Sequence, residues 1–415
     1  MTLQKPEEAE RHIEQLPESI GTREFIVLIA ALTSIIALAI DSMLPALPAI
    51  ADDFALTNPN DRQLVITAFV LAFGPAQLIF GPLSDSIGRR RVLMGGVIVF
   101  SLASLAAVFA NSFDQLLVAR IVQGISAAAV RVSTNAIVRD CFSGRAMARI
   151  MSYVFTVFIL VPIAAPALGQ MMLWIADWHF IFLAFFVITA ALAVWYWMRL
   201  EETLPPARRQ KASAKTLWAA VKEILTNRIA LGYTLAVTLF FGGLFSFIVS
   251  IQQIVEVTYG LQDWFAVIFA ITSTFIGAAS LTNANLVRKH GMRRISHAAL
   301  ISFTVLGAVL LAINLVVTPP LWLAVLLIGL IMGSFGFVAG NFNALAMEPL
   351  GHIAGAASSV LGTISFTGGA LLGSMVGQFF NGTLVPLAAA YACFGALGLA
   401  IVLITERGRL FQAGD

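Results

Sequence analysis

Three ionisable side chains lie inside long apolar stretches of this sequence. Asp41 falls within the apolar run 25–49, and Arg120 and Arg131 fall within the run 115–138. A charge at the centre of a bilayer costs about 2.5–3.5 kcal/mol on insertion scales, so such residues usually face a cavity and have a function. The chemistry open to this set is proton transfer, because a carboxylate held between an apolar environment and an arginine can gain and lose a proton. A static ion pair that joins two helices is the alternative.

Asp41 and Arg120 are expected at similar depths in the membrane. Asp41 lies about sixteen residues into its run, and Arg120 lies a few residues into a run that crosses in the opposite direction, at about 1.5 Å per residue. We therefore predict that Asp41 and Arg120 are the proton-coupling residues and that both border a cavity.

Further polar residues are candidates for the same cavity. Arg131 follows Arg120 by about three helical turns and shares its face with Asn135 and with small residues such as Gly124. Arg131 could contact an anionic or polar substrate, but a structural arginine, or one that reaches the membrane surface, fits the pattern equally well. Polar residues of other apolar runs are further candidates for the cavity wall: Gln77, Gln252, Asn341 and Asn343. The alternative is that these four residues form hydrogen bonds between helices and do not contact substrate.

The composition requires lipid as the surroundings of the chain. Of the 415 residues, 59% are hydrophobic and 11% are charged, whereas a soluble domain has about 25% charged residues. The mean hydropathy is +0.90. No long basic stretch lies apart from the apolar runs, which argues against nucleic-acid binding. Cys141 and Cys393 stand alone, and the sequence has neither a phosphate-binding loop nor a metal-ligand spacing, so we expect no cofactor and no enzyme activity.

Twelve apolar runs are long enough to cross the membrane. A helix needs about 20 residues to span roughly 30 Å of hydrocarbon. The apolar character is continuous rather than alternating, so the expected fold class is an all-α membrane protein. The runs are 25–49, 62–84, 91–110, 115–138, 150–173, 178–198, 229–254, 264–285, 296–316, 321–347, 352–379 and 384–404.

The positive charges predict the orientation of the chain. Of the 25 Lys and Arg residues, all but three fall in the tails and loops of one side. Arg62 alone lies on the other side, and Arg120 and Arg131 lie inside a run. Because loops rich in Lys and Arg stay in the cytoplasm, both termini are expected there, with the chain in a bacterial inner membrane.

A polar linker divides the chain into two halves. The expected parts are a cytoplasmic tail at 1–24, a six-helix bundle at 25–198, a cytoplasmic linker at 199–228, a second six-helix bundle at 229–404 and a tail at 405–415. The first tail is acidic, so it is not expected to be a signal peptide. Segments 81–91 and 283–294 resemble each other, and two such parallel repeats predict a substrate site between the halves, with alternating access by rocking.

The turn after the second run carries the strongest local motif. It reads Gly81-Pro-Leu-Ser-Asp85-Ser-Ile-Gly88-Arg89-Arg90-Arg91. Glycine permits a tight reversal of the chain. Asp85 beside Arg89 and Arg90 can form a charged latch that breaks as the halves rock. A plain turn with basic residues on the cytoplasmic side is the alternative.

The fifth run contains a second candidate for conformational change. Pro162 and Pro166 remove backbone donors and predict a bend, which either helps the bundle open and close or is a fixed kink. Gly169, which ends the segment Pro166-Ala-Leu-Gly169, is a further candidate for a role in conformational change.

The turn motif resembles the one that follows helix 2 in the major facilitator superfamily. Three segments are similar to its drug:proton antiporter branch: Asp41-Ser-Met-Leu-Pro45-Ala-Leu-Pro48, Leu116-Leu-Val-Ala-Arg120-Ile-Val-Gln123-Gly124 and Pro162-Ile-Ala-Ala-Pro166-Ala-Leu-Gly169. Three more resemble its Bcr/CflA subfamily: Trp178 with Phe182, Glu202-Thr-Leu-Pro205 and His352-Ile-Ala-Gly355. The similarity covers nearly the whole chain after residue 24. Ala165, Gln170 and Met43 depart from the usual patterns, and Gln170 puts the barrier to proton leak at that position in doubt.

The resemblance implies a function. It implies a major facilitator fold and a proton-coupled antiporter that exports small amphiphilic compounds, such as antibiotics, by alternating access. A monomer in lipid would suffice, with the proton gradient in place of a cofactor. An exporter of an ordinary metabolite, such as an amino acid or sugar, is the alternative. A membrane enzyme or a sensor is a more distant one.

Overall fold

The computed structural model describes residues 16, 19–142, 144–209 and 214–412, and within these ranges the chain forms helices without strands. Twelve of the described helices have 20 residues or more. The helices are α1 Thr22–Asp41, α2 Leu47–Asp53, α3 Leu64–Ile87, α4 Arg89–Val108, α5 Phe113–Cys141, α6 Gly144–Ile175, α7 His179–Arg199, α8 Ala214–Thr226, α9 Arg228–Gln253, α10 Phe265–His290, α11 Met292–Asn314, α12 Leu321–Met347, α13 Ala354–Gln378 and α14 Val385–Thr405.

The apolar helices agree with a membrane protein. Ten stretches of the described chain are long and apolar enough to cross a bilayer; one of them, Leu321–Gln378, contains both α12 and α13. In α6 a shorter apolar stretch, Leu160–Ile175, stands out. The structure therefore has ten to twelve candidate spans. Their bounds lie within a few residues of the runs expected from hydropathy, except that the first run is divided after Asp41 and that α6 begins at Gly144 rather than near residue 150.

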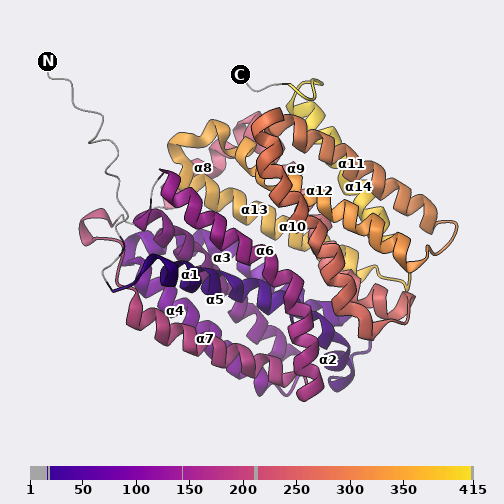
Figure 1. Cartoon of the computed structure of the whole chain (residues 1–415), viewed down its shortest axis with the longest axis horizontal. Helices are drawn as coiled ribbons and strands as arrows, with labels where there is room; N and C mark the ends of the chain where they lie inside the picture. Colours follow the sequence, from indigo (N-terminus) through magenta and orange to yellow (C-terminus); the bar gives the residue numbers. More distant parts are fainter. Residues whose placement is uncertain (1–15, 17–18, 143, 210–213, 413–415) are drawn as a thin grey trace.

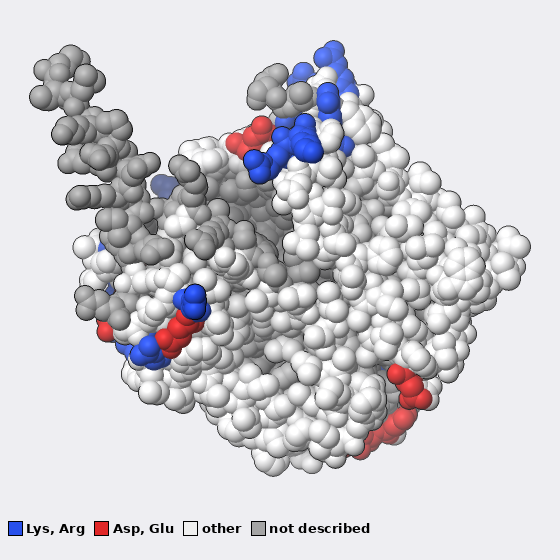
Figure 2. All heavy atoms as spheres, viewed as in Figure 1, with Lys and Arg blue, Asp and Glu red and all other residues white. Residues whose placement is uncertain are grey.

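Charged groups gather at the two ends of the helices. The start of α1 and the end of α14 lie at one end of the molecule, called here the termini end, whereas α2 lies at the opposite end (Figure 1). Figure 2 shows Lys and Arg near the termini end and a small acidic group at the opposite end, with uncharged surface between them. Exposed apolar side chains lie between the ends of the helices, as Leu102 does in α4, Val187 in α7 and Val309 in α11. The uncharged surface thus has the character of a surface that contacts lipid.

The helices form two groups that lie next to each other (Figure 1). The first group is α1–α7, drawn in indigo to magenta, and the second group is α9–α14, drawn in orange to yellow. Contacts between the groups run along α3 with α13 and along α6 with α10. The linker between the groups contains α8, which packs on α13 and α9 and buries Ala220 and Ile224 completely.

Glycine allows the contact between α3 and α13 to be close. A Cβ atom on Gly74 of α3 would lie 2.2 Å from Oγ1 of Thr367 in α13, so no larger residue fits without movement. Thr363, one turn earlier in α13, donates a hydrogen bond to the carbonyl of Gly74 (3.0 Å). A hydrogen bond from a side chain of one group to the backbone of the other thus helps to join the two groups.

The first apolar run does not form one helix, contrary to the expectation for 25–49. Helix α1 ends at Asp41, a short 3-10 helix covers Leu44–Ala46, and α2 then begins at Leu47. Pro45 and Pro48 lack backbone N–H groups and cannot continue the hydrogen-bond ladder of α1. Asp41 therefore occupies the end of a helix rather than its interior.

Candidate functional site

Asp41 is a buried carboxylate at the break after α1. Its side chain is 4% exposed. Among the described residues, no hydrogen bond or ion pair joins this carboxylate to another group. Gly169 of α6 packs against the same break, because a Cβ atom there would lie 2.1 Å from the carbonyl oxygen of Ser42. A role of Gly169 in conformational change stays a prediction.

Arg120 of α5 is fully buried and is held by neutral acceptors. Its Nε donates to the carbonyl of Val65 (2.9 Å), Nη1 to Oε1 of Gln123 (2.8 Å) and Nη2 to the carbonyl of Ala39 (2.9 Å). The guanidinium also lies over the ring of Phe69, 4.7 Å from its centre. Uncharged acceptors and a ring face thus replace the carboxylate that an arginine usually needs when buried.

The expected ion pair between Asp41 and Arg120 is therefore not formed in this conformation. Arg120 instead binds the backbone two residues before Asp41 and so fixes the end of α1. The contact of Arg120 with this part of α1 runs through the carbonyl of Ala39.

The other expected cavity residues lie apart from this pair. Arg131 is half-buried and Asn135 is exposed, both on α5. Gln77 of α3 is half-buried, and its Nε2 has no hydrogen-bond partner among the described atoms. In the second group Asn341 donates to Oδ1 of Asn283 (3.0 Å), and Asn343 donates to the carbonyl of Ala339 (2.9 Å). The last two bonds lie within the second group.

Gln252 was expected in the wall of the substrate cavity, but the structure places it near one end of the molecule. It is buried near the end of α9, at the end of the molecule opposite the termini. Its Nε2 donates to Oε2 of Glu256 (2.9 Å). In this conformation Gln252 thus positions a carboxylate.

The turn between α3 and α4 forms a network around Arg89, which is 4% exposed. Arg89 bonds Asp85 through Nη1 and Asp140, at the end of α5, through Nε (3.0 Å). Arg90 donates to the carbonyl of Trp197 (2.6 Å) and lies over its ring. All of these partners belong to the first group, so the latch closes within one group in this conformation.

Glu202, just after α7, completes this network. Its two carboxylate oxygens accept hydrogen bonds from the backbone N–H groups of Arg89 (2.9 Å) and Arg90 (3.2 Å) at the start of α4. A carboxylate at a helix N-terminus satisfies free donors and balances the helix dipole. Gly88 has φ 108°, and a Cβ atom there would lie 2.2 Å from Oε2 of Glu202, so both its backbone angle and its space require glycine.

The second group has a related cluster. Gly291 precedes α11 with φ 81° and ψ 157°, close to the angles of Gly88 before α4. Arg293 pairs with Glu406, after α14 (3.1 Å), and with Glu348, after α12 (2.9 Å). The repeat seen in the two turn sequences thus extends to an arginine held by two carboxylates.

Sequence reasoning missed the partners in these clusters. Asp140, Glu348 and Glu406 were not singled out, and Glu202 was noted only as part of a subfamily motif. The available signal was their position: each acidic residue ends or follows an apolar run on the side where basic residues dominate.

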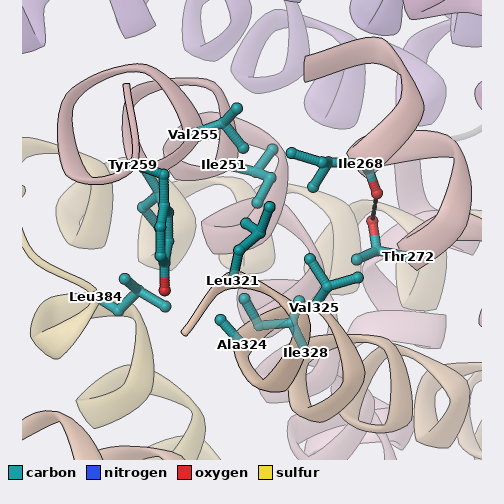
Figure 3. A pocket seen from close by; sticks show the side chains of 11 residues that line it. Ile251, Val255, Tyr259, Ile268, Thr272, Leu321, Ala324, Val325, Ile328 and Leu384 are labelled. Atoms are coloured by element: carbon teal, nitrogen blue, oxygen red, sulfur yellow. Dashed lines mark hydrogen bonds between the residues drawn. The ribbon is translucent and has the colours of Figure 1, made fainter. Parts of the chain in front are cut away.

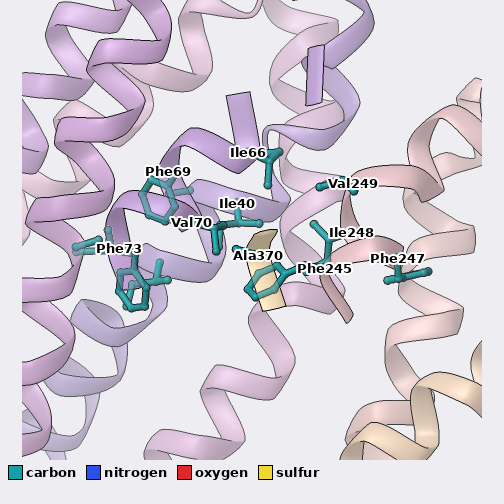
Figure 4. Close-up of a cluster of buried hydrophobic side chains, with 14 of the residues drawn as sticks. Ile40, Ile66, Phe69, Val70, Phe73, Phe245, Phe247, Ile248, Val249 and Ala370 are labelled. Atoms are coloured by element: carbon teal, nitrogen blue, oxygen red, sulfur yellow. The ribbon is translucent and has the colours of Figure 1, made fainter. Parts of the chain in front are cut away.

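Buried hydrophobic side chains from both groups form a cluster that includes Ile40, the residue before Asp41; this cluster is called here the hydrophobic layer. Figure 4 shows Ile40, Ile66 and Val70 of the first group near Phe245, Ile248 and Val249 of α9. A small separate pocket lies within the second group and is lined by apolar residues of α9, α10 and α12 (Figure 3). Thr272 there turns its hydroxyl to the carbonyl of Ile268 (3.0 Å), so the pocket offers few polar groups to a ligand.

Comparisons with known proteins identify the family. The sequence profile of the Major Facilitator Superfamily matches residues 28–374. An uncharacterized MFS-type transporter, YdgK, of Bacillus subtilis (strain 168) is 31% identical over 366 residues, covering 86% of this chain and 89% of the relative. The bicyclomycin resistance protein homolog of Haemophilus influenzae is 28% identical over 385 residues, covering 92% and 96%.

A solved structure agrees on the fold. The peptide transporter POT, crystallised with sulfate, superposes with a TM-score of 0.76 at 12% identity, covering 94% of this chain and 96% of that one. At this identity the likeness concerns the fold alone. With the matching profile over most of its length and the two groups of helices described above, this chain belongs to the Major Facilitator Superfamily and is a membrane transporter rather than an enzyme.

Proposed function

We propose that this chain exports small amphiphilic compounds, antibiotics among them, in exchange for protons. Drug efflux is supported by the relative named for bicyclomycin resistance, which matches nearly the full length of both chains. The proposed arrangement has twelve membrane spans in two six-helix bundles, 25–198 and 229–404, with both termini in the cytoplasm of a bacterial cell. The termini end is then the inner side. A monomer suffices, and the proton gradient takes the place of a cofactor.

The observation that carries the proton coupling is the buried carboxylate of Asp41, which bonds to no other group among the residues that the structure describes. Burying an ionised carboxylate without a partner is costly, and binding a proton removes the cost. In the conformation described here Asp41 holds its proton. When the groups rock and water reaches the break after α1, the proton leaves. Arg120 lies close enough to stabilise the ionised state through the end of α1.

Alternating access requires that the contacts between the groups change. The proposed motion separates α3 from α13, where Gly74 and Thr363 now meet. The Arg89 cluster holds α4 to α5 and to the segment after α7. The first group is therefore expected to rock as one body.

The test is proton movement driven by substrate in inverted vesicles that contain Asp41→Asn. Exchange of substrate without proton release is the expected result, because the amide cannot bind and release a proton. Asp114→Asn, an exposed carboxylate in the first turn of α5, is the matched control and should keep normal coupling. If Asp41→Asn still releases protons in step with substrate exchange, Asp41 is not the residue that carries the proton.

An exporter of an ordinary metabolite is the second candidate function. It would use the same helices and the same proton site, and it differs only in the residues that contact substrate. Overexpression separates the two: drug export lowers antibiotic sensitivity, whereas metabolite export raises the external concentration of an amino acid or sugar.

A further inference from the structure

Six polar residues join the two groups at the end opposite the termini. Asn60, Arg62 and Gln63 lie in the 3-10 helix Pro59–Gln63 just before α3. They face three residues of the second group: Gln253, Glu256 and Gln378. These six residues are called here the polar clamp. Arg62 is also the basic residue that the sequence places alone on the side of the membrane opposite the cytoplasm.

The contacts of Asn60 bind the loop before α3 to the second group. Its Nδ2 donates to the carbonyls of Gln378 and Phe380, both at 3.0 Å. In return Gln378 donates through Nε2 to the carbonyl of Asn60 (3.1 Å). Gln253 donates to Oδ1 of Asn60 (3.0 Å).

The remaining contacts of the clamp are largely shielded from water. Gln63 donates a hydrogen bond to Oε1 of Gln253, and each of these residues is 1% exposed. Arg62 forms an ion pair with Glu256 (3.0 Å), with side-chain exposures of 7% and 26%. Gln252 bonds the same carboxylate oxygen and fixes its position. Low exposure makes such polar contacts costly to break without replacement.

The ion pairs at the other end of the molecule are arranged differently. The pairs of Arg89 stay within the first group, and those of Arg293 stay within the second. Where both side chains of an ion pair are described, Arg62–Glu256 is the one that crosses between the groups. Polar contacts between the groups are therefore concentrated at the end opposite the termini.

We propose that the polar clamp is the outer gate of the transporter. Its contacts hold that end closed in the present conformation, and each transport cycle breaks and re-forms them. The hydrophobic layer that contains Ile66 lies directly behind the clamp and is exposed to the outside only when the clamp opens. This assignment rests on the alternating access and the orientation of the proposed function, but it requires neither protons nor any particular substrate.

The experiment measures access to the layer behind the clamp. Ile66, fully buried in α3, is replaced by cysteine, and the exposed native cysteine is removed as Cys393→Ser. Intact cells are treated with a membrane-impermeant maleimide, and the labelled fraction is followed in time. Arg62→Gln or Glu256→Gln should raise the labelling rate about fivefold, which corresponds to ~1 kcal/mol, the upper value for a partly exposed ion pair.

Two further variants separate an open gate from a misfolded protein. The charge exchange Arg62→Glu with Glu256→Arg should return labelling toward the starting rate, which a damaged protein would not do. Gly377→Ala acts without touching a charge: its Cβ atom would lie 1.9 Å from Oε1 of Gln63 and 2.8 Å from Cγ2 of Val249, so it should also raise labelling.

Matched controls complete the design. Asp263→Asn removes an exposed carboxylate near Glu256, and Gly340→Ala adds a methyl group where no atom lies within 4 Å, so both should label at the starting rate. If Arg62→Gln, Glu256→Gln and Gly377→Ala all leave the labelling rate unchanged, the polar clamp is not the outer gate. Equal increases in the controls would exclude this role as well. Neither outcome depends on proton coupling, so a negative result with Asp41→Asn leaves this test intact.

Discussion

Gly169 is the residue at which α6 touches the break after Asp41, and Gly169→Ala tests how closely that break must be held. The added Cβ atom would lie 2.1 Å from the carbonyl oxygen of Ser42, 2.9 Å from its carbon and 3.0 Å from Cγ of Pro45. Two of these atoms belong to the backbone and cannot rotate away. Relief requires roughly 1 Å of movement between α6 and the break, and such overpacking costs about 1–3 kcal/mol.

The expected effect is a loss of stability together with a loss of coupling. Thermal unfolding of the purified protein should begin at a lower temperature, and vesicles should show less proton release per substrate exchanged. Gly340→Ala in α12 is the matched control, because its Cβ meets open space and alanine favours a helix by about 1 kcal/mol over glycine. If Gly169→Ala unfolds and couples like the unmodified protein, the close contact does not position Asp41.

Three further substitutions test the contacts described above. Glu202→Gln removes the charge that caps α4 and should lower stability by about 1 kcal/mol in thermal unfolding. Arg120→Lys keeps a charge but cannot reach three separate acceptors, so a loss of about 1.5–3 kcal/mol and of transport in vesicles is expected. Gly74→Ala places a Cβ atom 2.2 Å from Oγ1 of Thr367 and should lower both stability and transport, measured in the same assays.

The first two of these substitutions each have a matched control: a neighbouring glutamate for Glu202 and another arginine for Arg120. Glu201→Gln and Arg91→Lys change exposed residues and should leave stability as it was. Equal unfolding of Glu202→Gln and Glu201→Gln would contradict the helix cap. Full transport by Arg120→Lys would show that the charge of Arg120 suffices without its directional bonds.

The positions of the helices followed from the sequence because hydropathy is a local property. Runs of apolar residues gave the bounds of helices such as α9 and α12 to within a few residues. The break after Asp41 was missed although Pro45 and Pro48 signal it, because the apolar run continues across both prolines. The helix α8 in the linker was also missed, since its buried face is short and depends on α13 and α9 for its contacts.

The partners of the site residues could not be read from the sequence, because they come from distant parts of the chain. Depth counting placed Asp41 beside Arg120, but it could not show that Arg120 prefers the carbonyls of Ala39 and Val65. Gln63 and Gln253 are 190 residues apart, and neither carries a charge that would draw notice. Hydrogen bonds between neutral side chains depend on packing that only the folded chain supplies.

The unequal distribution of contacts between the two ends has a consequence for the response to salt. Dissolved ions screen charges over about 8 Å at physiological ionic strength and act mainly on pairs that water reaches. The Arg62–Glu256 pair joins the groups and is partly exposed, whereas the pairs of Arg89 and Arg293 hold each group together internally. Salt added on the side of Arg62 should therefore shift the balance between open and closed forms, and salt on the side of the termini should change mainly the rigidity of each group.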